Sequence, residues 1–312
     1  RATNIPDGYD PLGYLIDLAH DDSGTGKYIH VHAWFVMHRI TTGESLDPQH
    51  VLSQHPDYVM YKSDGSTGAS TKFLDPGHPG VVDHNVDVII DCLKNYDIDG
   101  INLDYIRYPE YSGEWGYNPQ SIGRFNTFYG KTGDPSGSDP DWDDWRRECV
   151  TKEVQKLYIK SHMIDPDVVI TADTVNWGYR YNDFESSSAY AGVFQDWVEW
   201  LDLGILDYNA LMNYSTSMSR FEGWTDLSLA SDAKRGSIIG VGSYMQDSVQ
   251  DFIDQAKYAR NNGAEGINIY DWYSETNAMG VSREEFYDTV RRELFQGWTE
   301  PPEMPWIENP TT

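Results

Sequence analysis

Residues 98–105 read Ile-Asp-Gly-Ile-Asn-Leu-Asp-Tyr, and this short run decides the fold. Apolar and polar residues alternate along it, which predicts a β-strand whose two faces meet different surroundings. An amphipathic stretch at 81–96, typical of a helix, comes directly before it. A helix that leads into such a strand is the unit from which parallel sheets are built.

The same alternation of helical stretches and short β-rich runs continues along the chain, which indicates parallel strands joined by crossover helices. Strands are expected at residues 28–35, 73–76, 98–105, 168–173, 203–214, 237–244 and 266–270. Helices are expected at residues 10–20, 81–96, 142–162, 193–200, 249–262 and 283–294.

The fold class predicted from this order is α/β, a (β/α)8 TIM barrel. A closed barrel needs eight strands, and the pattern gives seven, so we expect the first strand to lie upstream of Arg1. Residues 1–297 are expected to form the barrel, and residues 298–312 an irregular Pro-rich tail. An open doubly wound sheet is the alternative, but no Gly-rich phosphate loop supports it.

An internal echo favours the barrel. Asp99-Gly-Ile-Asn-Leu-Asp104 recurs as Glu265-Gly-Ile-Asn-Ile-Tyr270, and each copy follows a helical stretch. Strands four positions apart would be related in this way if two halves of a barrel were duplicated.

The composition excludes some classes of protein. The chain has 312 residues with 14% aromatics, including 11 Trp and 22 Tyr, and such a content argues against disorder. The net charge of −27 repels phosphate backbones, so nucleic acid is not an expected partner. That charge keeps a protein soluble, and it also suits a cationic polymer such as a partly deacetylated amino sugar. No apolar run is long enough to span a membrane.

The two cysteines, Cys92 and Cys149, both fall in expected helices. Neither belongs to a CxxC motif or lies at metal-ligand spacing from a histidine, so metal or redox chemistry is not expected. Buried free thiols are favoured over a disulfide, and no cofactor is expected.

Strand parity selects the side chains that face the barrel lumen, because inward and outward residues alternate. Ile101 and Leu103 must contact helices, so Asn102 and Asp104 point inward. Asp104 is the last inward residue, at the carboxyl end where barrel enzymes keep their chemistry. Its alternative role is a structural ion pair with Arg107.

The strand at 168–173 ends in a second inward acid, Asp173. Asp104 and Asp173 lie on neighbouring strands, which places the two carboxyls within several ångströms. Glycosidases use a carboxyl pair about 5–5.5 Å apart when they retain configuration and about 6.5–9.5 Å apart when they invert it. One carboxyl donates a proton, and the other attacks or activates water.

Other side chains at the same end of the strands are candidates for substrate contact. His32 and Trp34 point inward on the strand at 28–35, and His30 with His32 lacks a carboxylate to complete a metal site. Asp271 occupies the phase of Tyr105 rather than of Asp104, so it is a binding candidate, and Glu275 is an outside candidate for the acid. The further binding candidates are Asn102, Arg107, Tyr108, Trp272 and, with parity left open, Asn213 and Tyr214.

The chain also resembles a known family, the glycosyl hydrolase-like 10 family of bacterial (β/α)8 glycoside hydrolases. The segment 96–109 is similar to the signature of that family, and the resemblance covers most of the chain up to about residue 180. Supporting motifs are Gly8-Tyr9-Asp10-Pro11-Leu12, His32-Ala33-Trp34-Phe35, Leu74-Asp75-Pro76-Gly77 with Pro79, and Asp144-Trp145-Arg146-Arg147-Glu148.

The resemblance implies that Arg1 closes the missing first strand and contacts substrate. This sequence departs from the family in two places: Tyr105 stands where a second acid is common, and Ala172-Asp173 stands where Ser-Pro is common. If Asp173 were particular to this chain, the fallback would be assistance by an N-acetyl group of the substrate.

The leading hypothesis is a secreted or cell-surface glycoside hydrolase that cleaves a microbial or cell-wall polysaccharide in an endo fashion. The partner expected is therefore a polysaccharide or oligosaccharide substrate. The alternatives are a non-catalytic carbohydrate-binding surface protein with a barrel fold and a structural or adhesive surface module. Fold analogy alone does not separate them.

Overall fold

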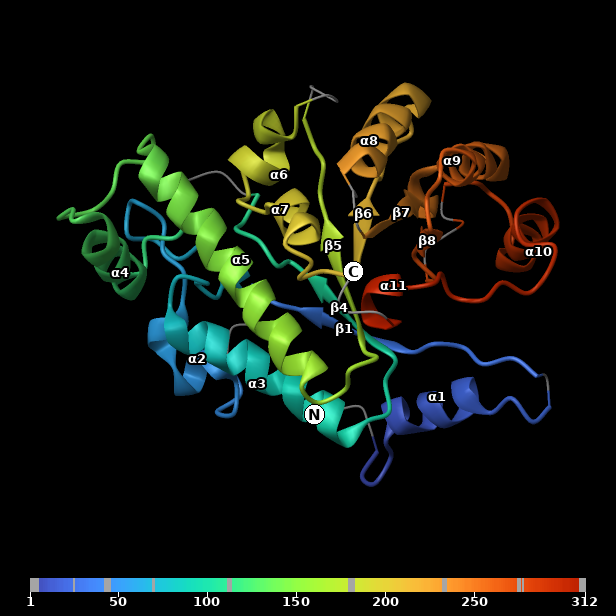
Figure 1. Cartoon of the computed structure of the whole chain (residues 1–312), viewed down its shortest axis with the longest axis horizontal. Helices are drawn as coiled ribbons and strands as arrows, with labels where there is room; N and C mark the ends of the chain where they lie inside the picture. The colour runs from blue at the N-terminus through green and yellow to red at the C-terminus, as the bar shows by residue number, and fades with distance from the viewer. Residues whose placement is uncertain are drawn as a thin grey trace.

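The structure is a computed structural model, and it describes residues 6–24, 26–41, 46–68, 71–110, 114–178, 183–231, 235–273, 276 and 278–308. Its centre is a curled sheet of six parallel strands in the order β1-β4-β5-β6-β7-β8, with helices against its outer face (Figure 1). The strands are β1 (His32–Val36), β2 (Arg39–Thr41), β3 (Thr71–Phe73), β4 (Gly100–Asp104), β5 (Val169–Thr174), β6 (Tyr208–Met212), β7 (Gly236–Gly242) and β8 (Gly266–Tyr270).

The described helices range from single turns to six turns. They are α1 (Pro11–His20), α2 (Val51–Gln54), α3 (Pro79–Asn95), α4 (Pro119–Tyr129), α5 (Pro140–His162), α6 (Ser188–Ala191), α7 (Trp197–Asp202), α8 (Met218–Ser231), α9 (Val249–Asn261), α10 (Arg283–Glu293) and α11 (Pro305–Glu308), with short 3-10 helices η1 (Pro56–Tyr58), η2 (Phe184–Ser186) and η3 (Ser243–Met245).

The expected parity of β4 is confirmed. Ile101 and Leu103 are fully buried in the cluster of apolar side chains between the sheet and helices α3 and α5. At the start of β4, Gly100 pairs with His32, and a Cβ atom at Gly100 would come within 2.5 Å of the His32 ring. Glycine is therefore the residue that lets β1 and β4 approach each other here.

The sequence of α3 contains the features that start a helix and bury one of its faces. Pro79 is its first residue, where the missing N–H costs nothing, and the His78 side chain caps the Gly80 N–H. Val86, Ile89 and the other buried apolar residues recur every three or four positions, so one stripe faces the sheet.

The prediction of a parallel strand at 73–76 is wrong. Thr71–Phe73 instead pairs antiparallel with Arg39–Thr41, in a separate two-stranded sheet. The reason is that β1 pairs directly with β4 over five residues, from His32–Gly100 to Val36–Asp104, which leaves no place for a strand between them. The main sheet of the described residues therefore has six strands rather than the seven expected.

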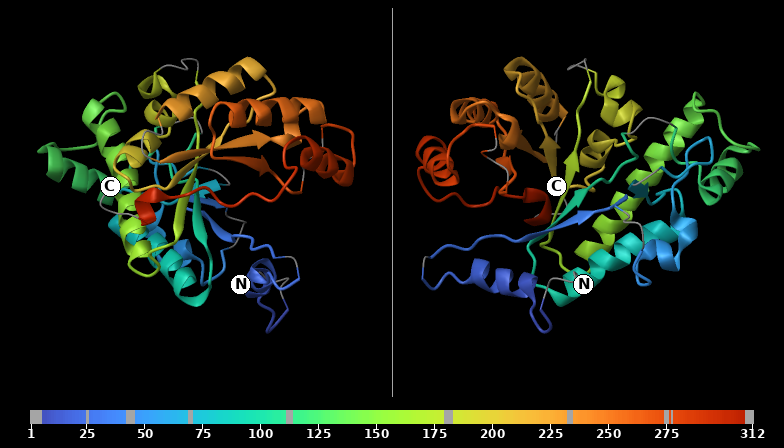
Figure 2. Two further views of the ribbon diagram at one scale, coloured as in Figure 1. Left: turned by 45° about the vertical axis from the view of Figure 1, so that its right-hand side comes forward. Right: turned by 180° about the vertical axis from the view of Figure 1, so that it is seen from behind.

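The C-terminal segment passes along the concave side of the sheet (Figure 2). Residues 298–304 have no regular structure, and α11 follows them. Trp306 of α11 anchors the segment, because its indole N–H donates to Asp207 at 2.9 Å. Pro301, Pro302 and Met304 close a lumen cavity of about 390 Å³ on one side.

Two further expectations concern the chemistry of the chain. Both cysteines are free thiols: Cys149 of α5 is buried, as expected, whereas Cys92 of α3 is only half-buried. Within the described residues, every helix is too short or too polar to traverse a lipid bilayer.

Candidate active site

Two carboxyl side chains meet at the carboxyl edge of the sheet. β4 and β5 pair in register as far as Leu103 and Ala172, so Asp104 and Asp173 occupy the next matching position on strands about 4.8 Å apart. Asp104 is 6% exposed and Asp173 is 9% exposed. The neighbouring buried acids predicted from strand parity therefore lie side by side.

Asn102 holds Asp173 in place. The Asn102 amide N–H donates to Asp173 Oδ2 at 2.9 Å, and its amide oxygen accepts from the Thr171 hydroxyl at 2.7 Å. A carboxyl oxygen accepts here, so the amide is oriented with its N–H group toward Asp173, and its oxygen then accepts from the Thr171 hydroxyl. Asn102 thus points inward, as predicted from the sequence, and its amide positions the carboxyl of Asp173.

The two acids differ in their surroundings. Burial, and then the charge of Asp104, raise the pKa of Asp173 to about 7. Burial also raises the pKa of Asp104, but the Arg107 guanidinium opposes this shift from 3.8 Å. The positive charge therefore lies beside Asp104 and not beside Asp173, and such a difference in surroundings is what divides two acids between an anionic and a proton-donating role.

Tyr105 was not expected to take part in the site. It follows Asp104 in the left-handed backbone region, with φ of 49°, and its N–H donates to Asp104 Oδ1 at 2.7 Å. The Arg39 guanidinium donates to the Tyr105 hydroxyl at 2.7 Å, and Arg107 lies over the ring with its Cζ 4.2 Å from the centroid. One signal for this residue is present in the sequence: Tyr105 stands where a second acid is common in the family that the chain resembles.

Three tyrosines gather on the other side of the acids. Tyr214 stacks on Tyr270 with ring centroids 5.2 Å apart, and Tyr244 meets both rings edge-on. Burial raises the pKa of Tyr214, and the charges of Asp173 and Asp104 act in the same direction. Tyr270 feels the charge of Asp104 as well, as expected of the residue in the phase of Asp104.

The structure also places the remaining candidates from the sequence. Trp34 is 57% exposed and lowers the pKa of Asp104 through a hydrogen bond, so it belongs to the site. His32 lines the lumen cavity together with His30, Asn102 and Asn268, deeper between the strands.

Asn213 is directed away from the acids. It is fully buried, and its amide donates to Phe221 O and Thr225 Oγ1 on α8. The parity left open in the sequence is therefore settled in favour of Tyr214. Trp272, which follows Asp271 in the chain, is exposed. Its ring lies against that of Tyr287 on α10, with the ring centroids 5.0 Å apart. Arg1 and Glu275 lie outside the described residues.

A buried pair supports the turn after β4. His38 and Glu153 are both fully buried, and His38 Nε2 lies 2.9 Å from Glu153 Oε2. His38 Nδ1 lies 3.2 Å from the Arg107 carbonyl oxygen, which only accepts, so Nδ1 carries a proton. The other oxygen of the Glu153 carboxyl accepts from the Asn85 amide at 2.8 Å. Helices α3 and α5 thus fix the backbone beside Asp104.

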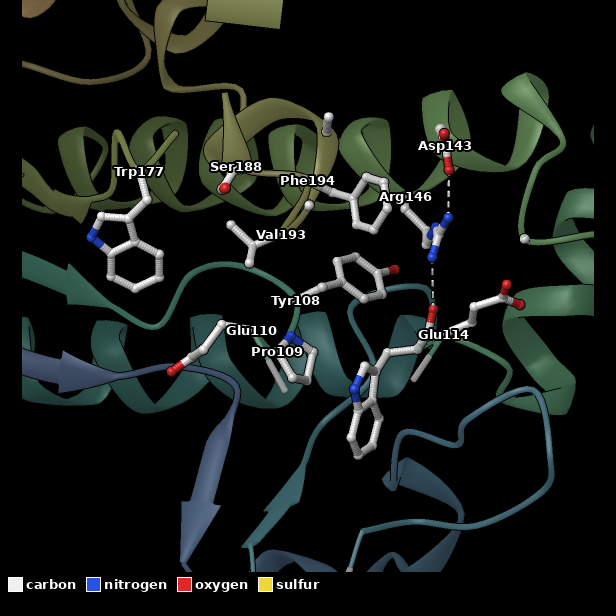
Figure 3. A pocket seen from close by; sticks show the side chains of 14 residues that line it. Tyr108, Pro109, Glu110, Glu114, Asp143, Arg146, Trp177, Ser188, Val193 and Phe194 are labelled. Atoms are coloured by element: carbon white, nitrogen blue, oxygen red, sulfur yellow. Dashed lines mark hydrogen bonds and ion pairs between the residues drawn. The ribbon is translucent and has the colours of Figure 1, made fainter. Parts of the chain in front are cut away.

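A pocket of about 390 Å³ opens beside this turn (Figure 3). We call it the Trp177 pocket; Trp177, Tyr108, Glu110, Asp143 and Phe194 are among the residues that line it. Tyr108 was expected to contact substrate, and it lies 1% exposed in the pocket wall, where it meets Phe194 edge-on.

In the part of the chain that the structure describes, no three His, Cys, Asp or Glu side chains come together as metal ligands.

A curled sheet of parallel strands, flanked by helices and carrying two acids at its carboxyl edge, defines a protein of the (β/α)-barrel class. Solved structures agree. The glycoside hydrolase domain of PgaB (BpsB) from Bordetella bronchiseptica superposes with a TM-score of 0.62 at 14% identity, covering 93% of this chain and 81% of that one. At this identity the likeness shows the fold.

The sequence comparisons give the family. The family model of glycosyl hydrolase-like 10 matches residues 2–245, so the chain belongs to that family. The glycosyl hydrolase DigH of Escherichia coli K12 is 28% identical over 70% of this chain and 51% of DigH. The glycosyl hydrolase YngK of Bacillus subtilis is 24% identical over 97% of this chain and 60% of YngK. The chain thus spans about half to three fifths of these relatives.

Proposed function

We propose that this chain hydrolyses glycosidic bonds inside a microbial or cell-wall polysaccharide, with Asp104 and Asp173 as its two acids. The observation that carries the proposal is the pairing of these carboxyls on adjacent strands, one beside Arg107 and the other with its pKa raised to about 7. Membership in a family of glycosyl hydrolase-like proteins supports the reaction class.

The surroundings of the two acids suggest their roles. Asp173 keeps its proton near neutral pH and is suited to protonate the leaving oxygen of the glycosidic bond. Asp104 faces Arg107, which favours its ionised form, so it is suited to attack the anomeric carbon or to activate water. Tyr214 has a raised pKa, to which the charges of both carboxyls contribute, so its hydroxyl stays protonated and is suited to donate a hydrogen bond to the sugar ring.

The substrate class is proposed from the rim of the site. Trp34, Tyr270 and Trp272 expose 57%, 36% and 66% of their surface, and aromatic faces cover the C–H faces of sugars. Exposed rings on both sides of the acids suit a chain that continues past the scissile bond, which means endo action. Action at the cell surface or outside the cell is part of the proposal, and the acidic charge is compatible with an amino-sugar polymer.

The test is a panel of cell-wall polysaccharides scored by the new reducing ends that appear. Wild type should release them from at least one polymer, and Asp104→Asn should lower the rate by at least about a hundredfold, because it removes a group that acts in the transition state. Asp97→Asn is the matched control: Asp97 lies near the opposite end of β4, and its side chain is 94% exposed.

Equal product from wild type and Asp104→Asn would remove Asp104 from the reaction. Binding of a polymer without product from wild type would instead support a non-catalytic carbohydrate-binding surface protein.

A further inference from the structure

The Arg107 guanidinium lies beside Asp104 at an ion-pair distance that is too long for a hydrogen bond. Its Nη1 atom is 3.8 Å from Asp104 Oδ1, and its Nη2 atom is 3.9 Å from Glu110 Oε2. In the part of the chain that the structure describes, the buried Nε and Nη1 atoms have no hydrogen-bond partner. Another contact must therefore set the position of this guanidinium.

The Tyr105 ring makes that contact. Arg107 Cζ lies 4.2 Å from the Tyr105 ring centroid, whereas the Trp177 centroid is 5.8 Å away. A guanidinium over an aromatic face is attracted by the ring, and the attraction is larger where water is excluded. Arg107 is 3% exposed, so water competes little for its charge. The place of the guanidinium thus depends on the place of the Tyr105 ring.

Arg39 holds the Tyr105 ring in turn. Its Nη1 atom donates to the Tyr105 hydroxyl at 2.7 Å, and its Cζ atom lies 4.8 Å from the ring centroid. A charged donor makes a stronger hydrogen bond than a neutral one. The ring is therefore anchored at its hydroxyl by one guanidinium, and it supports the other on its face.

The short sheet of β2 and β3 supplies Arg39. Arg39 is the first residue of β2, and it pairs with Phe73 of β3, which is 1% exposed. The N–H of His38, one residue earlier, donates to the Tyr105 carbonyl at 3.4 Å. Backbone hydrogen bonds thus join the segment that carries Arg39 both to β3 and to the turn after β4.

We propose that Tyr105 and Arg39 are positioning residues that hold the Arg107 guanidinium beside Asp104 and so keep Asp104 ionised. Arg39 acts through Tyr105, and Tyr105 acts through Arg107, so neither needs to touch the substrate. This role rests on the proposed function, in which Asp104 reacts as the anion. It gives the two-stranded sheet a part in the site, although that sheet lies outside the six-stranded one.

The electrostatic surroundings of Asp104 agree with this role. Burial raises the pKa of Asp104, and the charge of Arg107 is the largest influence that lowers it, with a smaller one from Arg39. The other ionisable groups of the site whose pKa responds to Asp104 are acids: Tyr105, Asp173, Tyr214 and Tyr270. Displacing the guanidinium groups should therefore favour the protonated form of Asp104.

Tyr105→Leu tests the role, because it removes the ring, changes no charge near neutral pH and keeps the backbone N–H that donates to Asp104. An opposite charge within about 4–6 Å lowers the pKa of a carboxyl by about one to three units. Part of this effect should be lost with the ring. On a polymer that the wild type cleaves, the loss in kcat should be at least about fivefold greater at pH 5 than at pH 7, with little change in KM.

Conservative variants separate the parts of the arrangement. Tyr105→Phe keeps the ring under Arg107 and loses only the hydroxyl, so it should lose less activity at pH 5 than Tyr105→Leu. Arg39→Lys keeps a charged donor, so it should lose less than Arg39→Met.

Tyr190→Leu is the matched control. Arg147 Cζ lies 4.0 Å from the Tyr190 ring centroid, and Arg147 pairs with Asp144, so the same kind of ring is removed from beneath a guanidinium on α5. The ratio of kcat at pH 5 to kcat at pH 7 should stay that of the wild type.

A titration without substrate gives the second readout. The free energy of unfolding of Asp173→Asn is compared with that of the double variant Asp104→Asn with Asp173→Asn, so that Asp104 is the acid that differs. Because the pKa of Asp104 is raised in the fold, the stability that Asp104 confers falls from about pH 4 upward and levels off above its folded-state pKa. With Tyr105→Leu added to both proteins it should level off at a higher pH, and with Tyr190→Leu at an unchanged pH.

A curve that levels off at the same pH with and without Tyr105→Leu, or one that Tyr190→Leu displaces as far, would overturn the positioning role. The outcome is separable from the proposed hydrolysis. If the wild type cleaves polymers and the curve does not move, the positioning role alone fails. If the curve moves and no polymer is cleaved, the proposed function fails while the arrangement around Asp104 is supported.

Discussion

The amide of Asn102 and the carboxyl of Asp173 are joined across two strands by a hydrogen bond of 2.9 Å. This bond favours the ionised form of Asp173, while burial and the charge of Asp104 favour the protonated form. The value of about 7 is the result of that competition, and it suits the general-acid role at neutral pH that we propose for Asp173.

Asn102→Ala tests the bond directly. Loss of the amide donor should raise the pKa of Asp173 further, so activity that needs the protonated acid should persist to higher pH. The alkaline limb of the kcat profile should therefore move upward. Asn268→Ala is the matched control, because Asn268 lines the same lumen cavity from β8, and an identical profile for both variants would contradict the assignment.

Asp173→Asn should separate activity from stability. We expect kcat to fall at least about tenfold. In the unfolded chain an Asp has a pKa of about 3.9, so between about pH 4 and pH 7 the unfolded state loses this proton first and the wild type loses stability as the pH rises. The variant has no such loss.

The gap in thermal stability between Asp173→Asn and wild type should open over that pH window, by at most about 4 kcal/mol, and stay constant at higher pH. Melting curves at several pH values measure it. A gap that is already complete at about pH 4 would show that the carboxyl is not held protonated by the fold.

Glu153→Gln tests how the buried pair supports the turn after β4. Glu153 acts through His38 on the Arg107 backbone, so we expect kcat to fall severalfold with little change in KM, together with a loss of about 3–5 kcal/mol of stability because a buried pair is broken. Kinetics are measured well below the melting temperature.

Asp99→Asn is the comparison for Glu153→Gln. Asp99 directly precedes β4, at the end of the strand opposite to Asp104, and its carboxyl lies 2.9 Å from His20 Nε2. It should cost stability and leave kcat unchanged. A similar fall in kcat for both variants would reduce Glu153 to a general stabilising role.

The two thiols should differ in reactivity. Burial raises the pKa of both Cys92 and Cys149, but Cys149 is 5% exposed whereas Cys92 is only half-buried. An aromatic disulfide reagent should therefore modify Cys92 slowly in the native protein and Cys149 only after unfolding. Cys92→Ser should abolish the native reaction, and a reaction that persists in that variant would contradict the burial of Cys149.

The sequence predicted those parts of the site that depend on strand parity. The alternation of Ile101, Asn102, Leu103 and Asp104 has period two, and a one-residue slip would have moved every side chain to the wrong face. For this reason the neighbourhood of Asp104 and Asp173 followed from the sequence, as did the place of Tyr270 in the phase of Asp104.

Strand parity could not predict the direction in which a strand pairs, the orientation of residues in a strand that is apolar on both faces, or the backbone conformation of the loops. The run at 73–76 has the apolar character of a strand, but its partner is β2, and pairing sense is a tertiary property. Asn213 could not be placed because its strand has apolar residues on both faces. Tyr105 takes a left-handed conformation that no local pattern announces in a non-glycine residue.

Several helices were not predicted, among them α4 and α8, and for α8 the signal was present in the sequence. Phe221, Trp224, Thr225 and Ser228 recur at helical spacing and are buried on one face of α8, yet Gly223 and several polar residues between them weaken the pattern. Asn213, whose amide donates to this helix, could only be assigned once α8 was known.

The outer strands β1 and β8 each have a sheet partner on one side only within the described residues. Each therefore presents a row of backbone N–H and C=O groups that can template the addition of another strand. With a sequence pI near 4.4, the strong mutual repulsion between copies at neutral pH vanishes on acidification. Colloidal behaviour thus follows from topology: reversible, concentration-dependent assembly is expected to begin as the solution approaches that pH, with the two sheet edges as its seeds.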